Sequence, residues 1–472
     1  MTERNIFSIF ATGKMARASF GAVALTLLAG CSFIPAYERP AAPVPEHFDG
    51  VTEAAATPLS PWRDYYTNPS LQVLIEAALN HNRDLTIALA RVDEARGLAG
   101  IARAERFPTL EAQASGNRSR LPGDLSGTGQ PVVISRYDAG LGVSAFELDF
   151  WGRVAALSEA ARAQYLATDE AAKSFRIGLI GDVANTWLQL TELAEREQLA
   201  LDTMKTREES LTIIRKRQEA GLSTDLDVLA AEGLVESVRA LWNDLKRQRI
   251  ETQNALRLLT GMAVTLPAPT NVLSQPSMAE LAPGLPSDVL LRRPDVRAAE
   301  QRLLAANASV GAARAAFFPR ITLTASTGSA SNELSGLFAS GSKAWLFNPV
   351  LTLPLFDAGR IRSTVDVAEA RKVQAVADYE KTIQQAFREV ADSLAAGSTY
   401  SEQVAALEAN LRAQQARFDR VKARQQAGIA NYLEVLDASR ETFLAEQVLV
   451  SSRRQLLSAH VTLYKVLGGG EQ

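Results

Sequence analysis

Two short stretches of this sequence carry the same pattern. Residues 217–229 read RQEAGLSTDLDVL and residues 424–436 read RQQAGIANYLEVL, so the second lies 207 positions after the first. Seven of the thirteen aligned positions are identical, namely Arg217/Arg424, Gln218/Gln425, Ala220/Ala427, Gly221/Gly428, Leu226/Leu433, Val228/Val435 and Leu229/Leu436. A repeat of this kind predicts two copies of one structural unit.

The composition of the repeated stretch is typical of a turn between two helices. A basic residue in the last turn of a helix meets its negative end, and a glycine in the left-handed conformation terminates it. A Ser, Thr or Asn then caps the returning helix, and acidic residues favour its first turn. The candidates are Arg217, Gly221, Ser223 or Thr224, Asp225 and Asp227 in the first copy, and Arg424, Gly428 and Asn431 in the second.

The distribution of proline predicts very long helices around these turns. All 19 prolines lie at or before Pro354, and the stretches 153–261 and 360–468 contain none. Both stretches are rich in strong helix formers. About 60 residues precede each glycine break, which corresponds to a helix on the order of 90 Å long.

The duplication extends well beyond the turns. Residues 151–153 align with 358–360 at the same offset of 207, and further upstream Phe107-Pro108 aligns with Phe318-Pro319 at an offset of 211. We therefore predict two structural repeats, residues 61–262 and 263–472, each with a helix, two strands and a long helical hairpin.

The interval between the helices of each repeat is typical of strands. Alternating and β-branched residues occur in 109–119, 139–150, 320–330 and 347–356, between loops rich in Gly, Pro and Ser. Strands of about ten residues suit a transmembrane β-barrel, but two soluble hairpins fit the pattern equally well. Four strands cannot close a barrel, so a membrane location would require two or more chains to pool their strands.

The N-terminus resembles a bacterial lipoprotein signal. Residues 18–31 form an apolar stretch that ends in Leu-Ala-Gly-Cys at Cys31, and Lys14 and Arg17 precede it. We expect residues 1–30 to be a signal peptide, with Met15 as a possible start, and Cys31 to carry a covalent lipid. Ser32 after the cysteine implies sorting to the outer membrane. The alternative is an ordinary signal followed by a free or buried cysteine. Residues 31–60 begin with a Pro-rich run that predicts an extended tether.

The overall composition argues against several classes of protein. The chain has 50 basic and 53 acidic residues, three histidines and one cysteine among 472 residues. This balance gives no case for nucleic-acid binding, and the spacing of the histidines and cysteine fits no usual metal site. No nucleophile–base pair or phosphate-binding loop is recognisable, so we expect neither an enzyme nor a cofactor other than the lipid on Cys31.

Three segments carry a resemblance to a known family. Residues 283–328 (PGLPSDVLLRRPDVRAAEQRLLAANASVGAARAAFFPRITLTASTG), residues 61–96 and the terminal LYKVLGGG are similar to the TolC-like outer-membrane factors, in the lipoprotein branch that serves tripartite (RND-type) efflux systems. The resemblance implies an α+β membrane protein: a homotrimer whose three chains give a 12-stranded transmembrane β-barrel, continued by a periplasmic α-barrel of long helices.

The same resemblance implies the function and the partners. The trimer would be the outer-membrane exit duct for small molecules such as drugs, and it would work with a periplasmic adaptor, an inner-membrane pump and outer-membrane lipid. Two alternatives remain at this point. A type I secretion duct has the same fold but exports polypeptides, and a lipid-anchored coiled-coil scaffold would have no pore.

The resemblance also implies roles for residues of the repeated turns. Adaptor docking would involve Arg217, Gly221 and Asp227 in the first copy, and Arg424, Gly428 and Val435 in the second. A gate would involve Leu433, Asp437 and Arg440, which lie on one face of a helix. The first copy has Ala230 where the second has Asp437. The alternative for Asp437 and Arg440 is a solvated ion pair without a further role.

Overall fold

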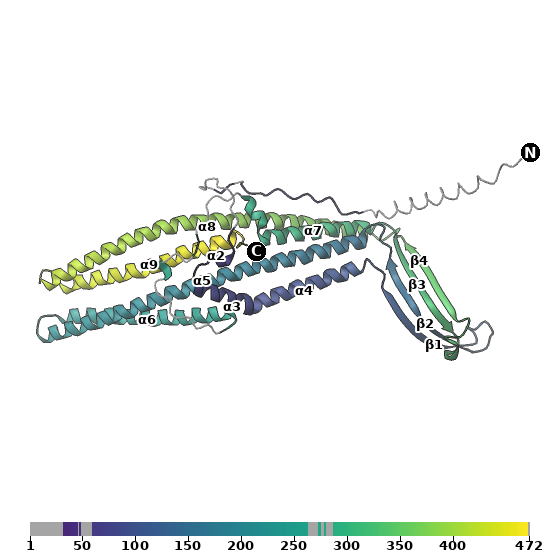
Figure 1. Ribbon diagram of the computed structural model, residues 1–472, viewed down its shortest axis with the longest axis horizontal. Coiled ribbons are helices and arrows are strands. Elements are labelled where there is room, and N and C mark those ends of the chain that lie inside the picture. The colour runs from purple at the N-terminus through teal and green to yellow at the C-terminus, as the bar shows by residue number, and fades with distance from the viewer. Residues whose placement is uncertain are drawn as a thin grey trace, which may run out of the picture. The chain divides into compact units, whose positions relative to one another are not determined.

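The computed structural model describes residues 32–45, 47–48, 59–262, 272–274, 278–279 and 287–470. The predicted signal peptide, 1–30, and Cys31 lie outside these residues. The first half contains α2 (Trp62–Tyr65), α3 (Pro69–His81), α4 (Arg83–Ala104), β1 (Leu110–Leu121), β2 (Val132–Glu147), α5 (Arg153–Glu219) and α6 (Asp225–Thr260). The second half contains η1 (Val272–Ser274), η2 (Ser287–Arg292), α7 (Pro294–Ala315), β3 (Arg320–Ser331), η3 (Leu334–Gly336), β4 (Lys343–Thr352), α8 (Arg360–Gln426) and α9 (Tyr432–Val466). Figure 1 shows these elements along the chain.

The order of the elements repeats. The series α4, β1, β2, α5, α6 is followed by α7, β3, β4, α8, α9. Helices α5 and α8 each have 67 residues and begin 207 positions apart. At 1.5 Å per residue each is about 100 Å long, as the proline-free stretches predicted. None of the described helices contains a run of residues apolar enough to cross a membrane.

Contacts divide the chain into two compact units, and each unit takes segments from both halves of the sequence. The first comprises the described residues up to Pro40 with 93–168 and 299–379, and the second comprises 41–92, 169–298 and 380–472. The contact units and the sequence repeats therefore divide the chain differently.

The first unit contains one four-stranded antiparallel sheet in the order β1-β2-β3-β4. Leu110 pairs with Val143 at one end of the β1–β2 ladder, and Arg320 pairs with Thr352 in the β3–β4 ladder. Within the described chain, β1 and β4 are each paired along one side only. Large apolar side chains of β4 are exposed, including Trp345 at 75% and Phe347 at 61%. The sheet thus presents two open edges and an apolar surface.

Two of the predicted strands have the wrong boundaries. Strand β2 spans 132–147 rather than 139–150, and β4 spans 343–352 rather than 347–356. The chain leaves the sheet early because carboxylates beyond each strand cap the next long helix. Asp149 accepts a hydrogen bond from the Ala155 amide at 2.7 Å. In the second copy, Asp357 accepts one from the Ile361 amide at 2.8 Å.

The segment that follows Cys31 lies against α7 in the first unit. It contains neither helix nor strand over 32–45. The ring of Phe33 stacks on Phe318 with centroids 4.5 Å apart, and Arg39 forms a bidentate ion pair with Glu300 at 2.7 and 3.0 Å. A Cβ on Gly311 would lie 2.7 Å from Ile34, so only glycine allows this close approach. The tether is therefore packed against the protein.

The second unit has an aromatic core where the first short helices meet the C-terminal helix. The ring of Tyr65 stacks on Tyr464 with centroids 4.1 Å apart. The two hydroxyl groups donate to backbone carbonyls, Tyr65 to His460 at 2.9 Å and Tyr464 to Ser60 at 2.8 Å. Trp187, 1% exposed, belongs to the same core and therefore serves packing.

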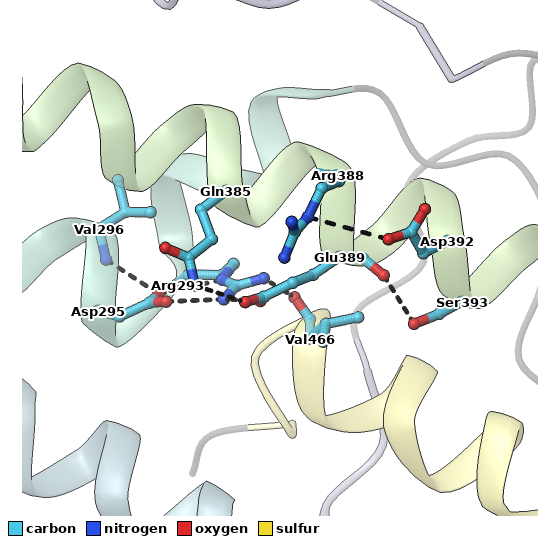
Figure 2. A network of polar contacts seen from close by, with 9 residues as sticks. All are labelled: Arg293, Asp295, Val296, Gln385, Arg388, Glu389, Asp392, Ser393 and Val466. Carbon is cyan, nitrogen blue, oxygen red and sulfur yellow. Dashed lines mark hydrogen bonds and ion pairs between the residues drawn. The ribbon is translucent and has the colours of Figure 1, made fainter.

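A buried arginine of the second unit contacts the start of α7, the middle of α8 and the end of α9 (Figure 2). Arg293, just before α7, pairs with Asp295 at 2.7 Å and with Glu389 of α8 at 2.8 Å. Its Nη1 donates to the carbonyl of Val466, the last residue of α9, at 2.8 Å. The guanidinium thus satisfies a carbonyl at the end of one helix and links the other two through carboxylates.

We expect Arg293→Ala to lower the free energy of unfolding by about 3 kcal/mol. This value is at the lower end of the destabilisation expected when one partner of a buried ion pair is removed. We choose the lower end because Asp295 and Glu389 remain partly accessible to water. The neighbouring Arg292 is exposed, so Arg292→Ala is the matched control and should change little. Thermal unfolding of the purified variants checks both, and equal melting temperatures would contradict the assigned role.

Candidate gate and docking surface at the hairpin tips

The first hairpin tip joins α5 to α6. Gly221 has φ +73°, and the Leu222 amide donates to the Arg217 carbonyl at 2.7 Å, which closes the end of α5. Thr224 caps α6 in a capping box with Asp227, whose carboxylate accepts from the Thr224 amide at 2.9 Å. The predicted roles of the glycine and the threonine are confirmed.

The capping box affects the ionisation of Asp227. The hydrogen bond from the Thr224 amide, aided by that from its hydroxyl group, lowers the pKa of the Asp227 carboxyl. The pKa of Asp227 is lower in the folded chain than in the unfolded chain. The capping box therefore stabilises the tip at pH values above the ordinary pKa of an aspartate. This stabilisation is lost as the pH falls through the lowered value.

The second tip, between α8 and α9, has the same geometry. Gly428 has φ +75°, and the Ile429 amide donates to the Arg424 carbonyl at 2.9 Å. Asn431 caps α9, and its side chain accepts from the Glu434 amide at 2.9 Å. Helices α6 and α9 then return beside α5 and α8 (Figure 1). The cap predicted at Asn431 is confirmed.

A groove of about 530 Å³ lies between the two tips and is lined by residues of both hairpins. Four of the six predicted docking residues line it, namely Arg217, Asp227, Gly428 and Val435. Gly221 and Arg424 are exposed at the turns and are not among the lining residues. The side chain of Val435 is 9% exposed, so it forms part of the wall of the groove.

Exposed apolar side chains surround the turns. Leu222 and Leu226 of the first tip are 70% and 69% exposed, and Ile429 and Leu433 of the second are 69% and 50% exposed. These are equivalent positions of the two copies, and an exposed apolar cluster is typical of a protein interaction site. No role was predicted from the sequence for Leu222, Leu226 or Ile429. Large apolar residues in an otherwise polar turn are the feature of the sequence that could have identified them.

The predicted gate residues lie close together on the second hairpin. The Asp437 carboxylate accepts from Arg440 Nη2 at 2.8 Å within α9, and from Arg417 Nη2 of α8 at 2.8 Å. All three side chains are roughly half exposed. Within one chain, Asp437 is therefore the centre of a two-arginine ion-pair cluster next to Leu433, and each pair is worth only about 0.2–1 kcal/mol.

Arg417 was missed by the sequence analysis. Arg417 lies 11 residues before Gly428 and Asp437 lies nine residues after it, so folding the sequence about the turn brings the two near each other. The first hairpin has Ser210, Ala230 and Gly233 at the positions of Arg417, Asp437 and Arg440. The ion-pair cluster thus exists in one of the two copies only.

No cluster of three or more His, Cys, Asp or Glu residues that could hold a metal ion occurs in the described part of the chain. The chemistry of the tips is therefore that of charge, hydrogen bonding and apolar contact.

The family model described as Outer membrane efflux protein matches residues 74–262 and 285–469. The chain belongs to the outer membrane efflux protein family. The solvent efflux pump outer membrane protein SrpC of Pseudomonas putida is 47% identical over 457 residues, which cover 95% of this chain and 97% of that one. This outer membrane efflux protein therefore matches its relative over nearly the whole length of both.

Two solved structures show the fold of the family. A membrane protein from Pseudomonas aeruginosa has a TM-score of 0.88 at 43% identity, covering 93% of this chain and 98% of that one. The open state of the Neisseria gonorrhoeae MtrE outer membrane channel has a TM-score of 0.85 at 37% identity, covering 93% and 98%. This outer membrane efflux protein thus has the α+β fold of the trimeric outer-membrane channels, with four strands per chain.

These findings give the location and the class of function. The chain is an outer-membrane protein that serves efflux. Its relatives are named as efflux proteins and channels, which are transporters rather than enzymes. The named relatives favour the efflux interpretation over the polypeptide-secretion and scaffold alternatives.

The left-handed glycines of the tips give a direct prediction. We expect Gly428→Ala to strain the second tip by about 1–2 kcal/mol, because an alanine at φ +75° brings its Cβ too close to the following carbonyl. Gly428→Asn should cost less, since asparagine tolerates this conformation. Hydrogen–deuterium exchange of residues 424–435 should be fastest in the alanine variant.

The matched control is Gly397→Ala. Gly397 lies inside α8 with open space around the position of a Cβ, so alanine there should stabilise the helix by about 0.5–1 kcal/mol. If Gly428→Ala exchanged no faster than the wild type, the left-handed glycine would not be what holds the turn.

Proposed function

We propose that three copies of this chain form the exit duct of a tripartite efflux pump. The duct passes small molecules such as drugs from a periplasmic adaptor and an inner-membrane pump to the exterior, and it opens and closes at the hairpin tips. SrpC, named as part of a solvent efflux pump, supports small molecules as the substrate class.

The open edges of the sheet carry the proposal of a trimer. Strands β1 and β4 each have an unpaired side within the described chain, and an unpaired edge is not viable in lipid. Three chains of four strands give a closed ring of 12, which lies within the known range of outer-membrane barrels. The long helices follow the strands in sequence and continue the duct into the periplasm.

The gate is formed by the second hairpin of each chain. By threefold symmetry, Leu433 forms an apolar ring and Asp437 an acidic ring held by Arg440 and Arg417. In this gate, opening breaks both pairs of each chain. At about 0.2–1 kcal/mol for each pair, the six pairs of the trimer give on the order of 1–6 kcal/mol. This is enough to keep a two-state gate mostly closed and small enough for a bound partner to open it.

The tips also form the docking surface for the adaptor. The predicted docking residues Arg217, Gly221, Asp227, Arg424, Gly428 and Val435 are joined there by the exposed leucines of the turns. Because the two tips differ in sequence, a ring of adaptor subunits would meet two kinds of site on each chain.

The lipid on Cys31 would add a second attachment to the membrane. Ser32, the next residue, begins the tether, in which Phe33 stacks on Phe318 and Arg39 pairs with Glu300 of α7. Mass spectrometry of the mature protein, cleaved before Cys31 and carrying acyl chains, is the measurement that tests this proposal.

We expect the double variant Asp437→Ala/Arg440→Ala to have a clearly larger single-channel conductance in planar bilayers than the wild type. Arg417→Ala should raise it less, because Asp437 keeps one arginine partner. Raising the salt concentration should open the wild type beyond the increase in bulk conductivity, because these exposed pairs are screened.

The control is Arg215→Ala/Glu232→Ala. These residues form a comparable ion pair, 2.6 Å long, between the helices of the first hairpin, and its loss should leave the conductance unchanged. Equal conductance in the wild type and in Asp437→Ala/Arg440→Ala would show that these residues do not form the gate. A correctly inserted trimer that conducts in no variant would contradict the duct itself.

A further inference from the structure

The two faces of the four-stranded sheet differ in polarity. The register of the strands decides which residues share a face, because residues opposite each other point the same way and neighbours along a strand alternate. The apolar face is the one that carries Leu141 and Phe347. The polar face is the one that carries Ser115 and Asp138. This alternation is typical of strands with lipid on one side and water on the other.

The charged side chains of the strands are divided unequally between these faces. All three carboxylates of the strands, Glu111, Asp138 and Glu147, lie on the polar face. Two cations share that face, and both are paired. Arg136 pairs with Asp138 at 2.8 Å, and Arg320 pairs with Glu147 at 2.6 Å. The polar face is therefore largely neutralised by its own residues.

The apolar face carries three cations and no carboxylate. The cations are Arg118 and Arg120 of β1 and Lys343 of β4, and all three are exposed. None of them forms an ion pair within the described residues, in contrast to the two arginines of the polar face. All three lie at the end of the sheet that is remote from the helices, since β1 ends at Leu121 and β4 begins at Lys343 (Figure 1). We call this end the distal end.

The distance along β1 places these cations at the level of lipid head groups. Arg120 lies ten positions after Leu110, the first residue of the strand. Ten positions correspond to about 34 Å along a strand, and at a tilt of about 40° to about 26 Å in height. The apolar band of an outer-membrane barrel is about 25 Å tall, so a strand that enters the membrane at Leu110 leaves the hydrocarbon near Arg120. An arginine at this boundary costs little, whereas one at mid-membrane costs several kcal/mol.

Aromatic side chains mark the same level on the apolar face. Tyr137 is opposite Gly116, where a Cβ would lie 3.1 Å from the tyrosine ring. Trp345, two positions after Lys343 on β4, is 75% exposed. Tyrosine and tryptophan are enriched where a membrane meets water. The distal end therefore combines an aromatic girdle with three unpaired cations.

In the proposed barrel the cations of two chains come together. Strand β1 of one chain lies beside β4 of the next, and β1 ends at the distal end where β4 begins. Lys343 of the next chain thus joins Arg118 and Arg120 on the lipid side of each junction. Three positive charges then lie within one short stretch of the barrel wall.

We propose that each junction binds the phosphate groups of a phosphorylated glycolipid of the outer leaflet, of the lipid A type, through Arg118, Arg120 and Lys343. Guanidinium groups hold phosphate oxygens through two parallel hydrogen bonds, and the ammonium adds a compact charge. The apolar face beneath them contacts the acyl chains of the same lipid. The inference rests on the proposed function, which places the helices in the periplasm and the distal end at the cell exterior.

The test is native mass spectrometry of the purified trimer, titrated in detergent with diphosphoryl lipid A. Arg118→Gln/Arg120→Gln should weaken the dissociation constant about 30-fold, because each basic residue near an anionic lipid surface contributes about fivefold. Lys343→Gln should weaken it about fivefold. Only intact trimers are counted in the spectra, so a variant that fails to assemble does not imitate a loss of binding.

Two further variants separate the charge from the fold. Arg118→Lys/Arg120→Lys keeps both cations and should retain most of the affinity. Arg83→Gln/Arg91→Gln removes two cations from exposed positions of α4 and should leave the affinity unchanged. An equal loss in this control, or no loss in Arg118→Gln/Arg120→Gln, would overturn the inference. An unchanged affinity in Lys343→Gln would overturn the placement of the site at the junction.

Two other ligands test the chemistry of the site. Lipid A stripped of both phosphates should bind the wild type as weakly as diphosphoryl lipid A binds Arg118→Gln/Arg120→Gln, and undiminished binding would overturn the role of phosphate. Inorganic phosphate should bind far more weakly than the lipid, since it makes no apolar contact. If it bound the wild type as tightly as diphosphoryl lipid A, the lipid would be excluded as the specific ligand.

Conductance of the wild-type trimer tests the proposed function separately. A conducting channel whose lipid binding is independent of Arg118 and Arg120 would overturn this inference alone. A trimer that binds diphosphoryl lipid A through these residues but conducts in no variant would contradict the duct and leave the lipid site in place.

Discussion

The open edges of a four-stranded sheet are the constraint on which the rest of this protein depends. Lipid offers no hydrogen bonds to an unpaired strand, and neither β1 nor β4 finds a second neighbour within the described chain. Other copies must supply those neighbours. Because each strand pair is continuous in sequence with a long helix, a ring of strands also places the helices in a ring. One requirement of the backbone thus calls for an assembly of several chains, and the proposed path for export depends on it.

The far end of each long helix is controlled by a few residues. A left-handed glycine and a capping box end and restart the helix at both tips, which makes the turns compact and well defined. The second hairpin adds Asp437 between two arginines, and the first adds the buried Arg207. The duplicated scaffold therefore holds different charges in its two copies, and the gate that we propose belongs to the second copy.

The helices, the tips and the presence of four strands could be predicted because their signals are local in the sequence. The absence of proline, the glycines at the turns and the capping residues each determine the structure of only a few neighbouring positions. The ends of β2 and β4 were wrong because Asp149 and Asp357 cap the following helices, which alternation of side chains does not reveal. The partners of Asp437 and the burial of Arg207 depend on how helices pack across a turn, so neither could be obtained from local pattern alone. The packing of the tether against α7 likewise joins segments more than 250 residues apart.

A closed barrel requires β1 of one chain to pair with β4 of the next, and disulfide cross-linking in native outer membranes can detect this pairing. Pairs of cysteines, one from a scan of β1 (110–121) and one from a scan of β4 (343–352), would be oxidised and separated under denaturing conditions. We expect cysteine pairs in register to give a ladder that stops at three covalently linked chains, and either cysteine alone to give no such ladder. Products confined to single chains, or a ladder that ends at two or continues beyond three, would contradict it.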